Sequence, residues 1–189
     1  MVSNTTIAIK FAGLTHTGHY ADNCPLGVAM VAAFAKKKFG KKIDVSMYKH
    51  PNALIKDLEN EIPQVLCFSS YVWNFRLSYE IASRVKNRSP NTVVVFGGPN
   101  FPLTSEEQES FLLKYPSIDF FVFREGEIAF SLLLEELMQN NFDFRLLKNK
   151  QKDLPNTFYV GPKGLNTGTP LEPIKELEKL NYNGVLSIE

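Results

Sequence analysis

Short runs of apolar and β-branched residues alternate along the chain with longer segments that have helical spacing. The short runs predict five strands, at residues 7–11, 43–48, 65–69, 93–97 and 120–124. The run at 93–96 is apolar at every position, which is typical of a parallel sheet covered by helices on both faces. This alternation predicts an α/β protein with a doubly wound, five-stranded parallel sheet.

The segments between the strands predict five helices. They lie at 26–39, at 53–60, from about 76 to 88, from 104 onward, and at 128–139. The first helix is expected to start after Pro25 and to end at Gly40, since proline suits a helix start and glycine a helix end. Thr104 and Glu107 form a capping box, which predicts where the fourth helix begins.

The pattern changes after residue 140. Turn residues around 157–160 predict a small hairpin, and 170–180 is charged and contains prolines. We therefore expect an α/β domain at 1–140 and a hairpin and linker at 141–189. The architecture corresponds to the flavodoxin-like variant of the Rossmann fold with a short C-terminal extension. Its ligand site is expected beyond the carboxyl ends of the strands, near the switch in strand order.

Composition and charge exclude several classes of protein. The 21 lysines and arginines nearly balance 20 acidic residues, so nucleic acid is not an expected partner. Cys24 and Cys67 are too far apart for a zinc knuckle, and they form no disulfide framework, which favours the reducing cytoplasm. No targeting segment or membrane-spanning run is present, so no membrane partner is expected either.

The first loop, 12–25, excludes common nucleotide chemistry. Gly13 and Gly18 have the spacing of a phosphate-binding P-loop, but His19 and Tyr20 stand where lysine and a hydroxyl residue belong. No Gly-x-Gly-x-x-Gly follows any strand, which argues against a dinucleotide site. A phosphoacceptor receiver needs acidic residues at the ends of the first and third strands, and none stands there.

The loop at 69–74 admits two interpretations. Its serines, aromatic residues and asparagine suit a large ligand that has both apolar and amide surface. Alternatively, the serines and Asn74 cap the next helix, and Trp73 packs in the core.

Two further loops also have alternative interpretations. Residues 97–100 form either a bare turn or a place of close ligand approach, and a branched residue at Gly98 is expected to exclude the ligand while leaving the fold intact. The carboxylates in 125–127 suit a helix start, where the macrodipole favours negative charge.

Taken together, the loops resemble the cobalamin-binding domain that precedes the catalytic barrel in many radical-SAM enzymes. The matching stretches are 25–29, 65–74, 93–99 and 118–127, within residues 7 to 140. The Gly-Gly-Pro and Glu-Gly-Glu triplets are fairly specific in combination. The resemblance implies a module that presents cobalamin to a radical-SAM barrel in the same chain, for methyl transfer or related radical chemistry.

The resemblance and the loop positions define a set of candidate cofactor-binding residues. They are Thr15, His16, Ser69, Ser70, Tyr71, Trp73, Asn74, Gly97, Gly98, Pro99, Asn100, Glu125 and Gly126. These residues are expected to line a cleft for the corrin ring and its nucleotide tail. No residue is assigned a catalytic role.

Two departures from the family pattern limit the expected activity. The sequence has no Cys-x-x-x-Cys-x-x-Cys, so a [4Fe-4S] cluster and S-adenosylmethionine would belong to the rest of a parent protein, and this chain alone is not expected to catalyse. It also lacks Asp-x-His-x-x-Gly in the first loop, although His16 and His19 are there, so no protein histidine is expected on cobalt. The alternative is a stand-alone flavodoxin-like interaction module that has lost the cofactor.

Overall fold

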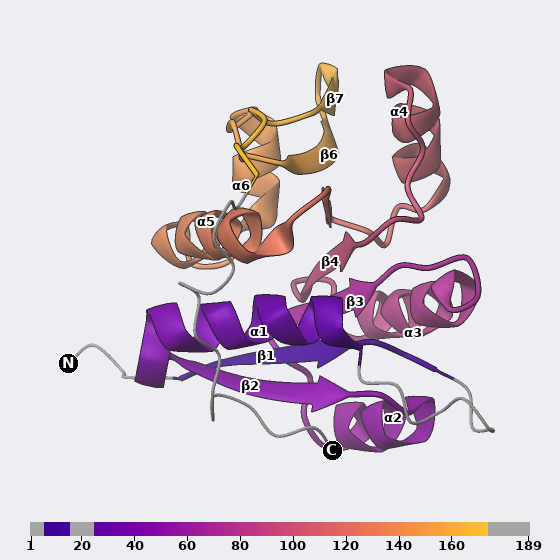
Figure 1. Ribbon diagram of the computed structural model, residues 1–189, viewed down its shortest axis with the longest axis vertical. Helices are drawn as coiled ribbons and strands as arrows, with labels where there is room; N and C mark the ends of the chain where they lie inside the picture. The colour runs from indigo at the N-terminus through magenta and orange to yellow at the C-terminus, as the bar shows by residue number, and fades with distance from the viewer. Residues whose placement is uncertain (1–5, 16–24, 174–189) are drawn as a thin grey trace.

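A seven-stranded sheet runs through the protein, which a computed structural model describes at residues 6–15 and 25–173. In chain order the elements are β1 (Ile7–Ala12), α1 (Leu26–Phe39), η1 (Gly40–Lys42), β2 (Ile43–Tyr48), α2 (Pro51–Asn60), β3 (Val65–Ser69), α3 (Phe75–Arg88), β4 (Val93–Gly97), α4 (Ser105–Lys114), β5 (Phe120–Val122), α5 (Gly126–Gln139), α6 (Phe144–Asn149), β6 (Thr157–Gly161) and β7 (Gly164–Asn166). Figure 1 shows α1 and α5 on one side of the sheet and α2 and α3 on the other.

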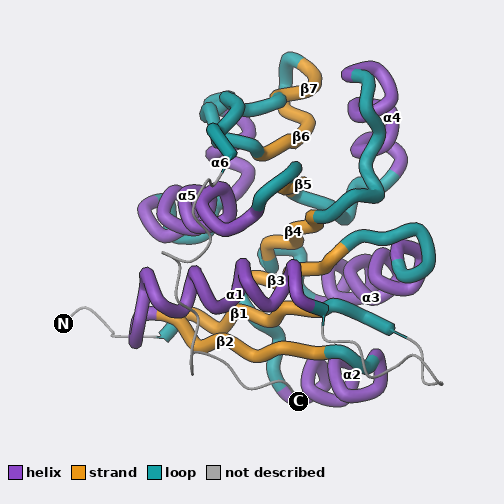
Figure 2. The backbone as a smooth tube through the Cα atoms, in the orientation of Figure 1, coloured by secondary structure: helices purple, strands orange, loops and turns teal. Residues whose placement is uncertain are grey.

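The strand order is β2-β1-β3-β4-β5-β6-β7, which Figure 2 shows from bottom to top. Strands β1 to β5 pair in parallel, as the sequence predicts. The predicted five-stranded count is wrong, because β6 pairs antiparallel with β5 and β7 with β6. The expected hairpin thus extends the sheet. If the hairpin did not pair with the sheet, β5 would be an edge strand with unpaired backbone groups. The Phe158 and Tyr159 side chains of β6 would then lose their buried positions.

The helix boundaries follow the sequence signals closely. Helix α1 has the expected ends, and α4 starts at its predicted cap, where the Thr104 side chain accepts a hydrogen bond from the Glu107 backbone N–H. Helix α6 was not predicted, since six residues are too few to show helical periodicity. Its Asp143 cap accepts a hydrogen bond from the Leu146 N–H.

Two hydrophobic clusters lie on opposite faces of the sheet. One lies under α1 and α5 and contains Phe11, Cys67 and Val95. The other lies under α2, α3 and α4 and contains Phe96 and Phe121. Successive side chains on a strand point to opposite faces, so neighbouring residues of each strand belong to different clusters.

A charged residue is buried on the α2 face of the sheet. Lys10 of β1 is 3% exposed, and its ammonium contacts the carboxylate of Asp57 on α2. The Tyr48 hydroxyl donates to the same carboxylate. Burial opposes ionisation, but these hydrogen bonds and the Lys10 charge outweigh it and lower the pKa of Asp57. The buried lysine is therefore paired, as the stability of the fold requires.

Candidate functional site

A cleft of about 350 Å³ opens at the carboxyl ends of the strands, close to the switch in strand order between β1 and β3. Its apolar side is formed by Phe11, Cys67, Val95 and Val122 from four parallel strands. The first turns of α1 and α5 border it. The sheet thus places the cleft where the strand order predicts a ligand site.

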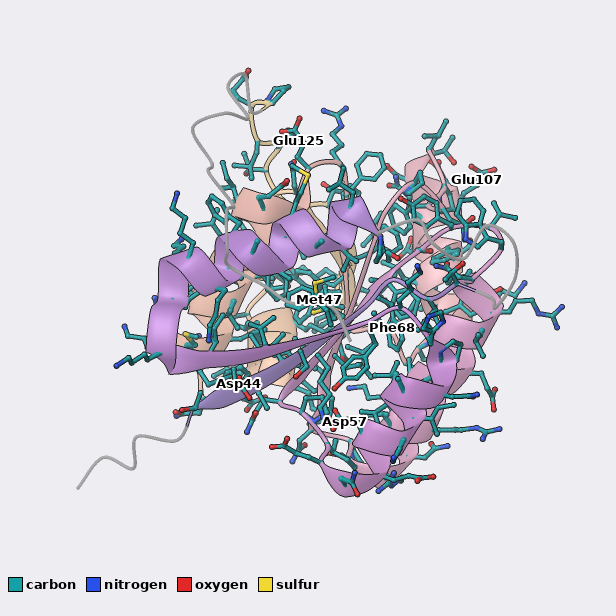
Figure 3. All side chains as sticks on the ribbon, turned by 60° about the horizontal axis from the view of Figure 1, so that its bottom comes forward. Asp44, Met47, Asp57, Phe68, Glu107 and Glu125 are labelled. Carbon is teal, nitrogen blue, oxygen red and sulfur yellow. The ribbon has the colours of Figure 1, made fainter. Side chains whose placement is uncertain are left out.

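Six predicted site residues line this cleft. They are Ser69, Tyr71, Gly97, Gly98, Glu125 and Gly126. The Ser69 hydroxyl is buried and has no hydrogen-bond partner among the described residues. A buried hydroxyl that the protein leaves unpaired is available to a ligand. Figure 3 shows Glu125 on the outside of the molecule, away from Phe68 and Met47 in the interior.

Other predicted residues lie outside the cleft. Pro99 and Asn100 border a separate groove beside Phe101 and α4. Ser70 is fully buried, and its hydroxyl lies 3.4 Å from the Asn100 side-chain nitrogen that donates to it. These contacts hold the third and fourth loops together. Ser70 and Asn100 do not line the cleft, but they join the two loops that carry the cleft residues Ser69 and Gly98.

Thr15, Trp73 and Asn74 line a third hollow, together with His50. Asn74 is 4% exposed, and its amide donates to the Leu14 carbonyl at 3.1 Å and accepts from the Tyr71 N–H at 2.9 Å. Asn74 thus joins the first and third loops, and its side chain does not cap α3. His50 is half-buried.

Trp73 does not pack in the core, as one interpretation of the third loop expected. It is 70% exposed and stacks on Tyr71, with ring centroids 4.4 Å apart. Of the remaining predictions, His16, His19 and Cys24 lie outside the described residues.

The backbone conformation of Gly98 supports the turn interpretation of residues 97–100. Its φ is +115°, and a Cβ at this position would lie 2.8 Å from the Ser70 carbonyl oxygen. A branched residue there would strain the turn, which argues against the expectation that such a substitution leaves the fold intact. Gly27 is the opposite case, because a Cβ at this cleft-lining position meets no atom within 4 Å.

Several cleft residues were not predicted from the sequence. Gly27 and Val31 come from α1, and Arg124 and Glu127 flank the Glu125-Gly126 pair. Arg124 has a left-handed backbone, with φ 63°, which places the turn into α5 beside the cleft. Gly27 and Glu127 fall within the stretches 25–29 and 118–127, which resemble the cobalamin-binding domain. These two residues could therefore have been predicted as site residues from that resemblance.

The chemistry of the cleft suits binding of an organic ligand. Burial raises the pKa of the Cys67 thiol well above its usual value, so the thiol stays neutral. Among residues 6–15 and 25–173, no group of three or more His, Cys, Asp or Glu side chains is arranged to hold a metal ion. The apolar floor, unpaired Ser69 hydroxyl and rim carboxylates match a large ligand with apolar and hydrogen-bonding surface.

Comparison with known proteins identifies the family. The model of the B12-binding domain matches residues 19–134, so the chain belongs to the family of B12-binding domains and cobalamin is its cofactor. This confirms the resemblance seen in the loops. No described helix is long and apolar enough to cross a membrane.

Two curated relatives share part of the sequence. The chain is 38% identical over 101 residues to the cobalamin-dependent radical SAM methyltransferase TokK of Streptomyces tokunonensis, covering 53% of this chain and 14% of that protein. It is 42% identical over 82 residues to 2-(S-pantetheinyl)-carbapenam-3-carboxylate methyltransferase of Streptantibioticus cattleyicolor, covering 43% of this chain and 12% of the relative. The matches therefore span only a small part of each relative.

A solved structure shows the same fold. The cobalamin-dependent S-adenosylmethionine radical enzyme OxsB, with aqua-cobalamin and S-adenosylmethionine bound, matches with a TM-score of 0.65 and 16% identity. The match covers 90% of this chain and 23% of OxsB. The similarity includes the segment after residue 140, in agreement with the continuous sheet.

Proposed function

We propose that this chain is the cobalamin-binding module of a radical-SAM enzyme and that it presents the cofactor to a catalytic barrel in the same polypeptide. The observation that carries the proposal is the cleft at the strand switch point, with its unpaired Ser69 hydroxyl, in a chain that belongs to the B12-binding family. Both curated relatives are methyltransferases, which favours methyl transfer as the parent reaction. Bound cobalamin would supply a cobalt centre that carries the methyl group.

Residues in and around the cleft have two kinds of role in holding the cofactor. Ser69 offers a hydroxyl, and Gly97 leaves the end of β4 open to close approach. Glu125 and Gly126 border the opposite wall at the start of α5. Gly98, Ser70 and Asn74 hold the loops in place through their backbone or side-chain contacts. We assign binding roles to the cleft-lining residues Ser69, Gly97, Glu125 and Gly126. We assign positioning roles to Gly98, Ser70 and Asn74.

The partner barrel would cover the carboxyl edge of the sheet. Leu26, Val72 and Trp73 are 65%, 82% and 70% exposed, and all three come from the first turn of α1 or the loop after β3. Such apolar side chains are usually covered when they gather at a functional edge. The [4Fe-4S] cluster and S-adenosylmethionine would bind to that barrel, because the sequence lacks the cysteine triad. We propose the reducing cytoplasm as the location.

Cobalamin is proposed to bind without a histidine on cobalt. An imidazole ligand needs an orienting partner, and the Asp-x-His-x-x-Gly arrangement that supplies one is missing from the first loop. Titration of the chain with hydroxocobalamin, followed by absorption, tests binding. Electron paramagnetic resonance of the reduced complex tests ligation: we expect no nitrogen splitting that depends on His16 or His19.

Two outcomes would contradict these proposals. Nitrogen splitting that disappears in His16→Ala or His19→Ala would show that a histidine ligates cobalt. A failure to bind hydroxocobalamin would favour the alternative module without cofactor. In that case a longer chain that includes the neighbouring barrel should be titrated as well, because the barrel can supply one wall of the cleft.

A further inference from the structure

Glu127 is a buried carboxylate in the wall of the cleft. It stands in the first turn of α5 and is only 6% exposed, yet it lines the cleft together with Gly126 and Val31. Its side chain makes no hydrogen bond or ion pair with any residue that the structure describes. A carboxylate that lines the cleft and has no bond within the described residues is available to a ligand that enters the cleft.

The helix dipole does not account for the burial. A negative side chain in a first turn stabilises a helix whether or not it is buried. Helix α4 shows this, because Glu106 and Glu107 occupy its first turn and are both exposed. The burial of Glu127 is thus a separate feature, and its position on the cleft connects it with the ligand.

We infer that Glu127 recognises a primary amide on the periphery of the corrin ring. The inference rests on the proposed function, since cobalamin must occupy the cleft. An ionised carboxylate only accepts hydrogen bonds, so the matching ligand group must donate them. The amide side chains around the corrin ring provide N–H donors without charge, and a bond to a carboxylate belongs to the stronger, charge-assisted class.

This assignment makes Glu127 a determinant of specificity. A corrinoid with a carboxylate in place of the contacted amide would bring two negative groups together in a buried site, where repulsion is strong. The protein should therefore reject one cobalamin monocarboxylate, in which a single peripheral amide is hydrolysed, and accept isomers hydrolysed elsewhere. Replacing Glu127 by glutamine removes the charge and should remove this discrimination.

The test compares Glu127→Gln with Glu106→Gln, a matched control in the first turn of α4 that lies away from the cleft. Each protein is titrated with hydroxocobalamin, with cobinamide, and with the separated monocarboxylates. We expect Glu127→Gln to bind hydroxocobalamin and cobinamide about tenfold or more weakly. It should also lose the rejection of one monocarboxylate. Glu106→Gln should behave like the parent in every titration.

The outcomes separate this inference from the proposed function. If the parent binds hydroxocobalamin and Glu127→Gln has the same affinities and the same isomer preference, the recognition role is overturned while cobalamin binding stands. A loss confined to hydroxocobalamin, with cobinamide unaffected, overturns it too, because cobinamide keeps the corrin amides but lacks the nucleotide tail. Failure of the parent to bind either corrinoid overturns both proposals. Thermal unfolding confirms that each variant is folded.

Discussion

The two faces of the sheet differ in the side chains that lie over the carboxyl ends of the parallel strands. On the face of α2, α3 and α4, Phe101 stacks on Phe121 with centroids 3.9 Å apart, and Phe75 meets Tyr115 edge-on at 4.7 Å. On the face of α1 and α5, the strand ends carry smaller residues such as Val122 and leave the cleft open. One set of strands thus builds a packed core on one face and a ligand site on the other.

Individual polar groups at the two places also differ in their pairing. On the filled face, Lys10 is paired with Asp57 of α2. At the cleft, the Ser69 hydroxyl and the Glu127 carboxylate have no partner among the described residues. A buried group that the protein pairs contributes to the stability of the fold, while an unpaired group that also lines the cleft is available to a ligand. The comparison suggests three experiments, in order of their effect on the free energy of unfolding.

The largest effect is expected from truncating the filled face. Phe121→Ala should lower the free energy of unfolding by about 3–5 kcal/mol, because the ring is fully buried and its neighbours cannot close the space. Val95→Ala, on the cleft face of β4, should cost only about 1.5 kcal/mol, at about 0.8 kcal/mol for each of two buried methyl groups. Urea denaturation measures both. Equal costs would contradict the difference between the faces.

The second experiment follows the pH dependence of the Lys10–Asp57 pair. The pKa of Asp57 is lowered in the folded protein from an ordinary value of 3.8, so ionisation stabilises the fold above pH 3.8. This contribution should disappear as the pH falls through the lower, folded-state value. We therefore expect the parent to exceed Asp57→Asn in stability near neutral pH and to approach it in acid.

Urea denaturation at a series of pH values provides the measurement. Lys10→Met serves as the matched variant, since it removes the cation and fits an apolar side chain into the buried position. Its pH dependence should be flatter than that of the parent. A difference between the parent and Asp57→Asn that persists unchanged into strong acid would show that the pair has no such role.

The smallest effect on stability is expected at Gly27, where the effect on binding should be large. A Cβ there meets open space, so Gly27→Phe should keep the free energy of unfolding within about 1 kcal/mol of the parent. Its ring should occupy the cleft and abolish hydroxocobalamin binding in the absorption titration. Gly27→Ala is the control, because it adds one carbon and should retain binding. Unchanged affinity in Gly27→Phe would place the ligand elsewhere.

Most of the fold could be predicted because its signals are local. The apolar runs determined the five parallel strands, and the caps at Pro25 and Thr104 determined where α1 and α4 start. The hairpin was also recognised from its turn residues. Its place in the sheet was not, since the pairing of Phe121 with Phe158 joins residues far apart in the sequence.

The sequence by itself determined the fold class, the family and the loops that could carry a site. Only the tertiary structure decided which loop residues reach the cleft: Ser69 does, whereas Asn74 is used internally to join two loops. It also separated Gly98, which the backbone needs, from Gly27, which leaves room. The physical reason is that burial, pairing and open space depend on neighbours from other elements, and a linear motif does not specify those neighbours.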